Sequence, residues 1–206
     1  KALDENVVAV QMSKNTLNMN QVRKLPALFG EVDIIKNIQM LPGVISAGEG
    51  TSAFFVRGGS ADQNLILIDE APVYDPSHLF GLFSVFNADV IKDSEIYKGG
   101  IPARFGGRLS SILDVRTKDG NNKKYEVNGG IGTMASRVAI QGPIMKEKSS
   151  FIVSARRSYV DLFLRAANED NLVHFYDINA KVNLRHNNRN RFFLAFYAGR
   201  DVFDFG

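Results

Sequence analysis

The chain has 206 residues, of which 45% are hydrophobic, and its formal net charge at pH 7 is +3. This length is enough for one large domain or two small ones with a packed core. Basic and acidic residues are interleaved, without the dense basic stripe of a nucleic-acid-binding protein, so we expect no nucleic-acid partner. The absence of cysteine excludes disulfides and thiol-ligated metals.

The two ends of the sequence do not look like domain boundaries. Residues 1–23 are polar and weakly patterned, which predicts a flexible lead-in. The other end stops directly after an aromatic run, without a polar tail. We therefore expect the chain to be part of a longer protein. No apolar run approaches the roughly 18 residues that a transmembrane helix needs.

Helix and strand signals alternate through residues 25–118. The stretch "GEVDIIKNIQMLPGV" carries Ile35 and Ile38 at helical spacing and ends at a Pro-Gly pair, which predicts one helix. Asn87 is placed to cap a second, short helix that reaches Lys92. The expected strands of this part are residues 54–57, 64–69, 94–98 and 110–116. This mixture predicts an α+β fold.

From Tyr125 onward the pattern changes to alternation. In residues 177–185 polar side chains alternate with apolar ones, which is typical of a strand with one polar and one apolar face. An aromatic strand over residues 192–205 follows a tight turn. Short connections alternate with a long one between Val160 and His174, as in an outer-membrane barrel. Alternation also fits a soluble antiparallel sheet, so the residues alone leave both architectures open.

A strongly apolar segment stands where the sequence predicts a loop. The turn residues Asp75, Pro76 and Ser77 are followed, through Phe86, by a run rich in leucine and phenylalanine. Side chains of this kind are normally buried.

The sequence contains no catalytic or metal-binding constellation. His78, His174 and His186 are scattered, without partners at ligand spacing. No motif arranges a nucleophile, a base and an orienting group. We therefore predict neither an enzyme nor a cofactor.

Three arginines lie beside glycine-rich turns at strand ends. They are Arg57, Arg104 and Arg108. Guanidinium groups in such places are suited to docking a domain against carboxylates on another wall. The alternative is that all three are ordinary solvated arginines.

Three stretches together resemble the plug domain of TonB-dependent outer-membrane receptors. They are "LPALFGEVDIIKNIQMLPGV", "FFVRGGSADQNLILIDEAPVYDPSHLFGLFSVFNADVIKDSEIYKGG" and "IPARFGGRLSSILDVRTKDG". The resemblance implies a mixed-sheet plug domain at residues 24–120, followed at 121–206 by antiparallel β-hairpins that are the first strands of an incomplete transmembrane β-barrel. The SusC-type branch carries a different pattern in place of "GGIPARFGGRLSSIL", so we do not expect that branch.

The resemblance implies transport across the outer membrane of a Gram-negative bacterium. Members of this family bind a scarce nutrient outside the cell, and the energising inner-membrane protein TonB pulls on the plug to open the barrel. The implied partners are TonB, outer-membrane lipid and a small nutrient ligand. TonB binds a short box by strand addition. Residues 5–10 have the β-branched composition of such a box, but we expect the box upstream of Lys1.

The resemblance also places the ligand site on three apical loops of the plug, at residues 48–52, 60–63 and 74–80. Because a plug lies inside a barrel, it further implies that the apolar segment ending at Phe86 packs on the barrel wall or faces the ligand. Arg57 matches the family's plug arginine, and with Arg104 and Arg108 it is expected to dock the plug on the barrel. The expected ligand-facing residues are Gly48, Glu49, Thr51, Ser60, Asp62, Gln63, Tyr74, Asp75, Ser77, His78 and Phe80.

Two further expectations concern the chain as a whole. An incomplete barrel leaves strand edges and an apolar stripe exposed, so the isolated chain should need detergent or associate with itself. The stripe is predicted to consist of Ile178, Ala180, Val182 and Leu184. The alternative function is that of a soluble α+β ligand-binding or signalling module without a membrane role.

Overall fold

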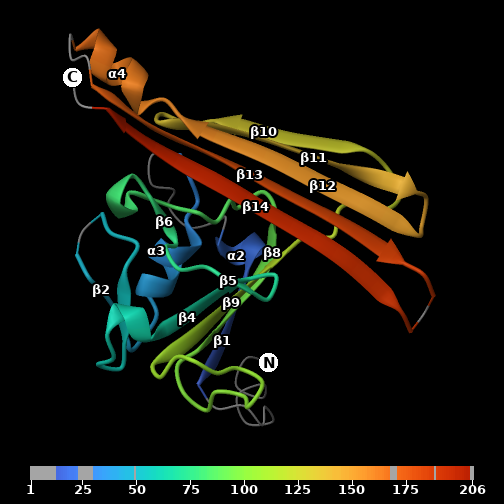
Figure 1. Ribbon diagram of the computed structural model, residues 1–206, viewed down its shortest axis with the longest axis horizontal. Helices are drawn as coiled ribbons and strands as arrows, with labels where there is room; N and C mark the ends of the chain where they lie inside the picture. Colours follow the sequence, from blue (N-terminus) through green and yellow to red (C-terminus); the bar gives the residue numbers. More distant parts are fainter. Residues whose placement is uncertain (1–12, 23–29, 49, 168–170, 188, 205–206) are drawn as a thin grey trace.

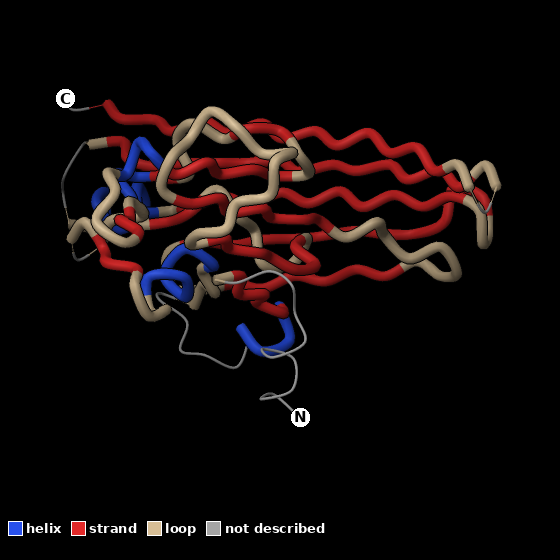
Figure 2. The backbone as a smooth tube through the Cα atoms, turned by 90° about the horizontal axis from the view of Figure 1, so that it is seen from below, coloured by secondary structure: helices blue, strands red, loops and turns tan. Residues whose placement is uncertain are grey.

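The computed structural model describes residues 13–22, 30–48, 50–167, 171–187 and 189–204. Its first part, residues 13–118, is a unit of short strands and helices that we call the N-terminal unit (Figure 1). Its second part, residues 126–204, is a sheet of long strands that we call the wall sheet. The N-terminal unit lies against one face of the wall sheet, whose strands run side by side along the long axis (Figure 2).

The N-terminal unit is built on a mixed five-stranded sheet in the order β1–β8–β9–β4–β5. Its strands are β1 (Lys14–Asn18), β8 (Ile91–Tyr97), β9 (Ser111–Thr117), β4 (Asn64–Ile68) and β5 (Ala71–Pro72). The β4–β9 pair is parallel, and the remaining pairs are antiparallel. The strands expected at 64–69, 94–98 and 110–116 are thus confirmed, with ends shifted by a few residues.

Short elements surround this sheet. They are α2 (Met19–Val22), α3 (Ile34–Gln39), β2 (Val44–Ser46), β3 (Phe54–Val56), η1 (Ala61–Gln63), β6 (Ser77–His78), η2 (Leu79–Gly81) and β7 (Phe83–Ser84). The helix α3 confirms the predicted one. Asp33 caps it by accepting hydrogen bonds from the amides of Ile35 (2.7 Å) and Lys36 (3.4 Å). Ile34, Ile35 and Ile38 are fully buried on its inner face.

Two segments differ from the sequence-based expectation. Residues 14–22, expected in a flexible lead-in, form β1 and α2, because β1 completes the edge of the sheet beside β8 and Val22 enters the core. Asn87 does not begin a helix. Its side-chain oxygen accepts a hydrogen bond from the amide of Asp89 over 2.9 Å. The residues that follow form β8, because they pair with β9 instead of forming a helix.

The wall sheet is an antiparallel meander in chain order. Its strands are β10 (Glu126–Ile131), β11 (Ala135–Met145), β12 (Ser149–Ser158), β13 (Leu172–Arg185) and β14 (Arg191–Asp204). The long connection between β12 and β13 carries a helix, α4 (Val160–Ala166), which the alternation pattern did not indicate. Within the described residues, no helix is long and apolar enough to cross a membrane.

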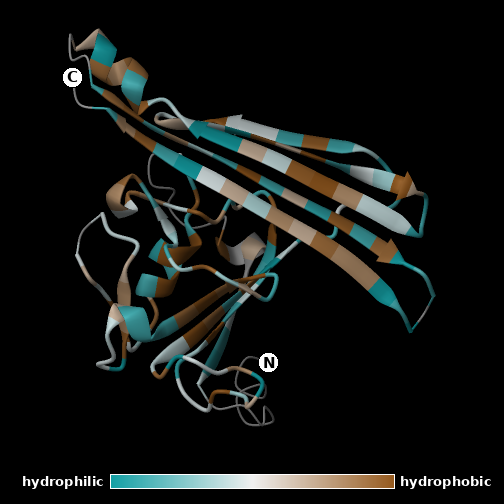
Figure 3. Cartoon of the chain, in the orientation of Figure 1, coloured by the Kyte–Doolittle hydropathy of each residue, from teal (hydrophilic) through white to brown (hydrophobic). Residues whose placement is uncertain are grey.

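The polar face of the wall sheet is turned toward the N-terminal unit. On β13, Asp177, Asn179 and Lys181 are buried, whereas Ile178 and Leu184 on the opposite face are 42% and 43% exposed. Figure 3 shows the corresponding alternation of hydrophilic and hydrophobic bands along the long strands. A soluble sandwich buries its apolar face, so this sheet has the orientation of a barrel wall, apolar outside and polar inside.

Two apolar clusters hold the parts together and account for the apolar segment. The main cluster lies between α3 and the mixed sheet, includes Val85 and Phe86, and reaches Ile152 of the wall sheet. A second cluster joins Leu79 and Phe83 to wall residues that include Phe175. The segment is therefore apolar because it fills the space between the N-terminal unit and the wall sheet.

Candidate functional site

A pocket of about 520 Å³ is lined by residues of all three loops that were expected to face a ligand. Ser52 comes from the first loop, Asp62 from the second and Tyr74 from the third. Arg108, expected in docking, also lines this pocket. Apolar residues also line it, namely Phe54, Leu65, Ile66, Pro72 and Val73. The pocket therefore combines a carboxylate, a guanidinium and a phenol with apolar surface, which suits a small ligand with both polar and apolar parts.

The first two loops are held by hydrogen bonds within themselves. The carbonyl of Gly48 accepts from the hydroxyl of Thr51 over 3.1 Å. In the second loop, Ser60 and Gln63 form a capping box that begins η1. Asp62 lies in this turn, is exposed and lines the pocket. Glu49, also predicted to face a ligand, lies outside the described residues.

The third loop is exposed at both ends and buried in between, at His78 and Leu79. Tyr74 is 86% exposed and Phe80 is 81% exposed, and the ring of Phe80 lies 4.5 Å from that of Phe203 on β14. Asp75 accepts hydrogen bonds from both the amide and the hydroxyl of Ser77. His78, in contrast, is 3% exposed.

His78 is buried because it contacts the wall sheet. Its Nδ1 lies 2.9 Å from Oδ1 of Asp201, and its Nε2 lies 3.1 Å from the hydroxyl of Tyr197. Its ring stacks on Phe175 with a centroid separation of 4.4 Å and an interplanar angle of 8°. The geometry gives His78 a contact with the wall rather than an opening toward a ligand.

A buried arginine of the wall sheet joins the two parts of the chain. Arg156 donates to Oδ2 of Asp177 from Nε (2.9 Å) and Nη2 (2.5 Å), and from Nη1 to Oε2 of Glu31 (3.1 Å). It also donates to the carbonyl of Ser84 over 2.7 Å. Beside it, Arg137 pairs with Glu31 over 3.2 Å and, through Nε, with Asp89 over 2.8 Å. Both arginines thus join the wall sheet to acidic residues of the N-terminal unit.

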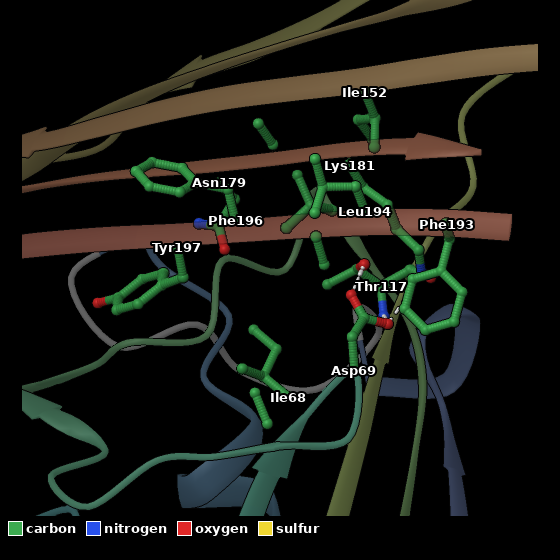
Figure 4. A pocket seen from close by; sticks show the side chains of 14 residues that line it. Ile68, Asp69, Thr117, Ile152, Asn179, Lys181, Phe193, Leu194, Phe196 and Tyr197 are labelled. Atoms are coloured by element: carbon green, nitrogen blue, oxygen red, sulfur yellow. Dashed lines mark hydrogen bonds and ion pairs between the residues drawn. The ribbon is translucent and has the colours of Figure 1, made fainter. Parts of the chain in front are cut away.

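A second polar contact closes one end of a cavity between the two parts, shown in Figure 4. Lys181 of β13 donates to Oδ1 of Asp69 over 2.8 Å and to the carbonyl of Thr117 over 3.2 Å. The cavity has a volume of about 210 Å³ and is otherwise mostly apolar, with Ile68 and Ile152 on opposite sides. Charged groups of the interface are thus paired across it rather than left facing apolar surface.

The three arginines predicted to dock the N-terminal unit have their described contacts within that unit. Arg57 donates to the hydroxyl of Ser13 over 2.8 Å, and Arg104 donates to that of Tyr97 over 3.4 Å. Burial and the neighbouring charge of Arg57 lower the pKa of Lys98, so the two cations lie close together. A docking role for Arg57, Arg104 and Arg108 stays a prediction.

The model of the TonB-dependent receptor plug domain family matches residues 9–111, which is half of the chain. The match spans the three loops described above and four of the five strands of the mixed sheet, and it ends at the first residue of β9. The chain belongs to the TonB-dependent receptors. The N-terminal unit is therefore the receptor's plug, and the wall sheet consists of strands of its barrel.

Solved structures of receptors and transporters share this fold. The siderophore receptor PirA from Acinetobacter baumannii aligns with a TM-score of 0.67 and 18% identity over 96% of this chain and 32% of its own. A ferric enterobactin receptor from Pseudomonas aeruginosa aligns with a TM-score of 0.62 and 17% identity, over 92% of this chain and 33% of its own. The copper transporter OprC aligns with a TM-score of 0.63 and 10% identity, over 92% of this chain and 30% of its own. At these identities the comparison shows the fold alone.

The chain spans about a third of the length of these solved receptors. In agreement with this, the five strands of the wall sheet do not close into a barrel. No curated protein sequence matches the chain.

Sequence reasoning missed the residues that hold the plug on the wall, namely Glu31, Asp89, Arg137 and Arg156. The available signal was the position of the two arginines on the polar face of alternating strands, since a charged residue facing a barrel lumen needs a partner inside it. The acidic partners could not be found in the same way, because Glu31 and Asp89 stand in ordinary turn-like sequence.

Proposed function

We propose that this chain is the plug and first barrel strands of an outer-membrane receptor that binds a small nutrient outside the cell and imports it to the periplasm, with TonB supplying the energy. The observation that carries the proposal is the docking of the plug on the polar face of a wall whose other face is apolar. The soluble alternative does not explain why that apolar face is exposed.

The pocket shared by the three loops supports a ligand site on the plug. Tyr74 offers a large amphipathic surface with little rotamer entropy to lose on binding. Asp62 and Arg108 offer opposite charges at the rim of the same pocket. A metal chelate that combines anionic groups with an organic scaffold fits this mixture, and among the similar solved structures one is of a siderophore receptor and another is of a ferric enterobactin receptor.

The test is uptake by the full-length receptor. A strain lacking this gene is supplied with labelled ferric siderophores of several chemical classes, with and without TonB. We expect at least one chelate to enter only when both proteins are present. The same strains are also supplied with labelled copper and cobalamin. The proposal is contradicted if loss of the receptor or of TonB changes the uptake of none of these compounds.

A single substitution then tests the pocket. Tyr74→Ala should weaken binding of the imported chelate by about 1–3 kcal/mol, the typical cost of removing an aromatic anchor. Tyr176→Ala is the control, because Tyr176 is 40% exposed on β13 and is not among the residues that line the pocket. Equal affinities for both variants would place the ligand elsewhere.

A further inference from the structure

The segment that carries Tyr74 at the pocket is joined closely to a buried contact with the wall. Residues 72–76 contribute Pro72, Val73, Tyr74 and Pro76 to the pocket. His78 follows only two residues later. Between them, Oδ1 of Asp75 accepts from the amide of Ser77 over 3.0 Å and from its hydroxyl over 2.5 Å. This turn leaves little freedom between the pocket and His78.

The contacts of His78 with the wall are unusually complete for a loop residue. In addition to Asp201 and Tyr197, its Nε2 lies 3.5 Å from Oδ2 of Asp177. The side chain is only 4% exposed, and its ring stacks on Phe175. All four of these partners belong to β13 or β14, so the position of His78 is set by the barrel wall.

The residues after His78 have a backbone conformation that needs such support. Leu79 and Phe80 have φ angles of +49° and +59°, which L-residues rarely adopt. Gly81 follows at +98°, and a Cβ there would lie 2.8 Å from the amide nitrogen of Ser52. The hydroxyl of Ser52 donates to the carbonyl of Gly81 over 2.9 Å. The strained turn is therefore held by the wall on one side and by the first ligand loop on the other.

We propose that His78 is a positioning residue of the ligand pocket: through Asp177, Tyr197 and Asp201 it fixes the pocket rim at residues 74–76, so that occupancy of the pocket and attachment of this segment to the wall are linked. The role of the pocket as a ligand site rests on the proposed function. The positioning of residues 74–76 by His78 does not, because it concerns the segment and the wall alone. Linkage is reciprocal, so a ligand that moves Tyr74 also shifts the contact of His78 with the wall.

The experiment measures the rim directly in the full-length receptor. A nitroxide is attached to a Tyr74→Cys variant, with any other reactive cysteine removed, and its mobility is read by electron paramagnetic resonance in detergent. The wall is then changed by Tyr197→Phe and Asp201→Asn, which leave the plug sequence intact. We expect the mobile fraction at position 74 to rise several-fold. Folding of the barrel should be unchanged, as measured by the shift in electrophoretic mobility on heating.

Matched variants separate positioning from general weakening. Ser154→Ala is the control, because it removes another hydroxyl of the wall sheet. This hydroxyl accepts a hydrogen bond from the side-chain amide of Asn87 over 3.4 Å, and Asn87 lies eleven positions after Pro76 in the sequence. His78→Ala should mobilise the label, and His78→Gln, which keeps a hydrogen-bonding side chain, should restore part of the order.

Two results would overturn the proposal. One is an unchanged label in the Tyr197→Phe, Asp201→Asn double variant. The other is an equal rise with Ser154→Ala, which would indicate loosening of the whole interface. The proposed function is tested separately. It is contradicted by uptake that does not need TonB, or by unchanged ligand binding in Tyr74→Ala. Neither of these results predicts the mobility of the label.

Discussion

Arg156 on β12 and Glu31 in the plug form a buried ion pair of 3.1 Å between residues 125 positions apart in the sequence. Their side chains are only 2% and 7% exposed. Two charges removed from water are tolerated only when their hydrogen-bonding capacity is used, and here Asp177 and the carbonyl of Ser84 accept the remaining donors of the guanidinium. The pair therefore favours one position of the plug on the wall over others.

Removal of this guanidinium should loosen the plug. Arg156→Ala leaves the carboxylates of Glu31 and Asp177 buried without their partner, and we expect the free energy of plug unfolding to fall by about 3–5 kcal/mol. Denaturant unfolding of the full-length receptor, followed by a plug-specific probe, measures it. The neighbouring Arg157→Ala is the control, since Arg157 is 52% exposed and pairs only with Asp161 among its described ion-pair partners. Its loss should cost less than about 1 kcal/mol. Similar effects of both substitutions would contradict the assignment.

The junction between plug and wall should tolerate no side chain at Gly120. This glycine has a φ of +83°, and a Cβ there would lie 2.2 Å from the carbonyl oxygen of Phe151. Gly58 has nearly the same φ, +82°, with nothing within 4 Å of its Cβ position. Gly58→Ala should therefore cost about 1 kcal/mol for backbone strain. Gly120→Ala should cost roughly 2 kcal/mol more, because the wall backbone must shift. Equal stability losses would show that the contact is absent.

The sequence was sufficient for the plug elements whose local signals agree with their surroundings. The spacing of Ile35 and Ile38 and the Pro-Gly pair after them predicted α3, and the apolar run at residues 64–69 predicted the strand β4. At Asn87 a good capping residue was present, but pairing of β8 with β9 overrode it. β1 was missed because Lys14–Asn18 is polar, and its strand conformation depends on β8 rather than on its own composition.

The sequence indicated the three loops that line the pocket, but not the contacts that hold them. Alternation on β13 revealed two faces, but a period of two does not say which face meets the plug. His78 looked like a ligand residue because it stands in an exposed-looking turn. Its burial depends on Asp201 and Tyr197, more than a hundred positions away, which no local pattern reports.

The attachment of β1 to the plug sheet should depend on pH. Burial raises the pKa of Glu95, but hydrogen bonds from Lys14 and Tyr97 outweigh it, so the pKa lies below its ordinary value. The carboxylate therefore contributes to the stability of the folded state above about pH 4.3, the ordinary pKa of glutamate. This contribution is lost as pH falls through the lower pKa of the folded state. The hydrogen bond with Glu95 raises the pKa of Lys14 above its ordinary value. The contribution of Lys14 to stability is therefore lost only as pH rises above that ordinary value.

Hydrogen exchange checks this dependence. The amide of Thr16, which faces Glu95 across the β1–β8 pair, should lose protection in acid relative to amides of β9. In Glu95→Gln the acid-dependent part should disappear. Acid-dependent protection that persists in this variant would assign the effect to another group.

The isolated chain should not behave as a soluble monomer. The outer strands β10 and β14 of the wall sheet have one unpaired edge each, and Leu194 and Phe196 are 75% and 58% exposed on the apolar face. Unpaired edges and an apolar face both promote association. Light scattering should therefore show oligomers in detergent-free buffer and a smaller species in detergent. A monodisperse monomer without detergent would refute this expectation.

The most direct test of the whole account is the direction in which successive side chains of β13 point. Single cysteines are placed at positions 177–182 of the full-length receptor in lipid vesicles, labelled with a fluorophore and exposed to a quencher confined to the lipid phase. Ile178, Ala180 and Val182 should be quenched, whereas Asp177, Asn179 and Lys181, buried against the plug, should be protected or should label poorly. Quenching without a period of two, or with the polar positions facing lipid, would contradict the assignment of this sheet as a barrel wall around a plug.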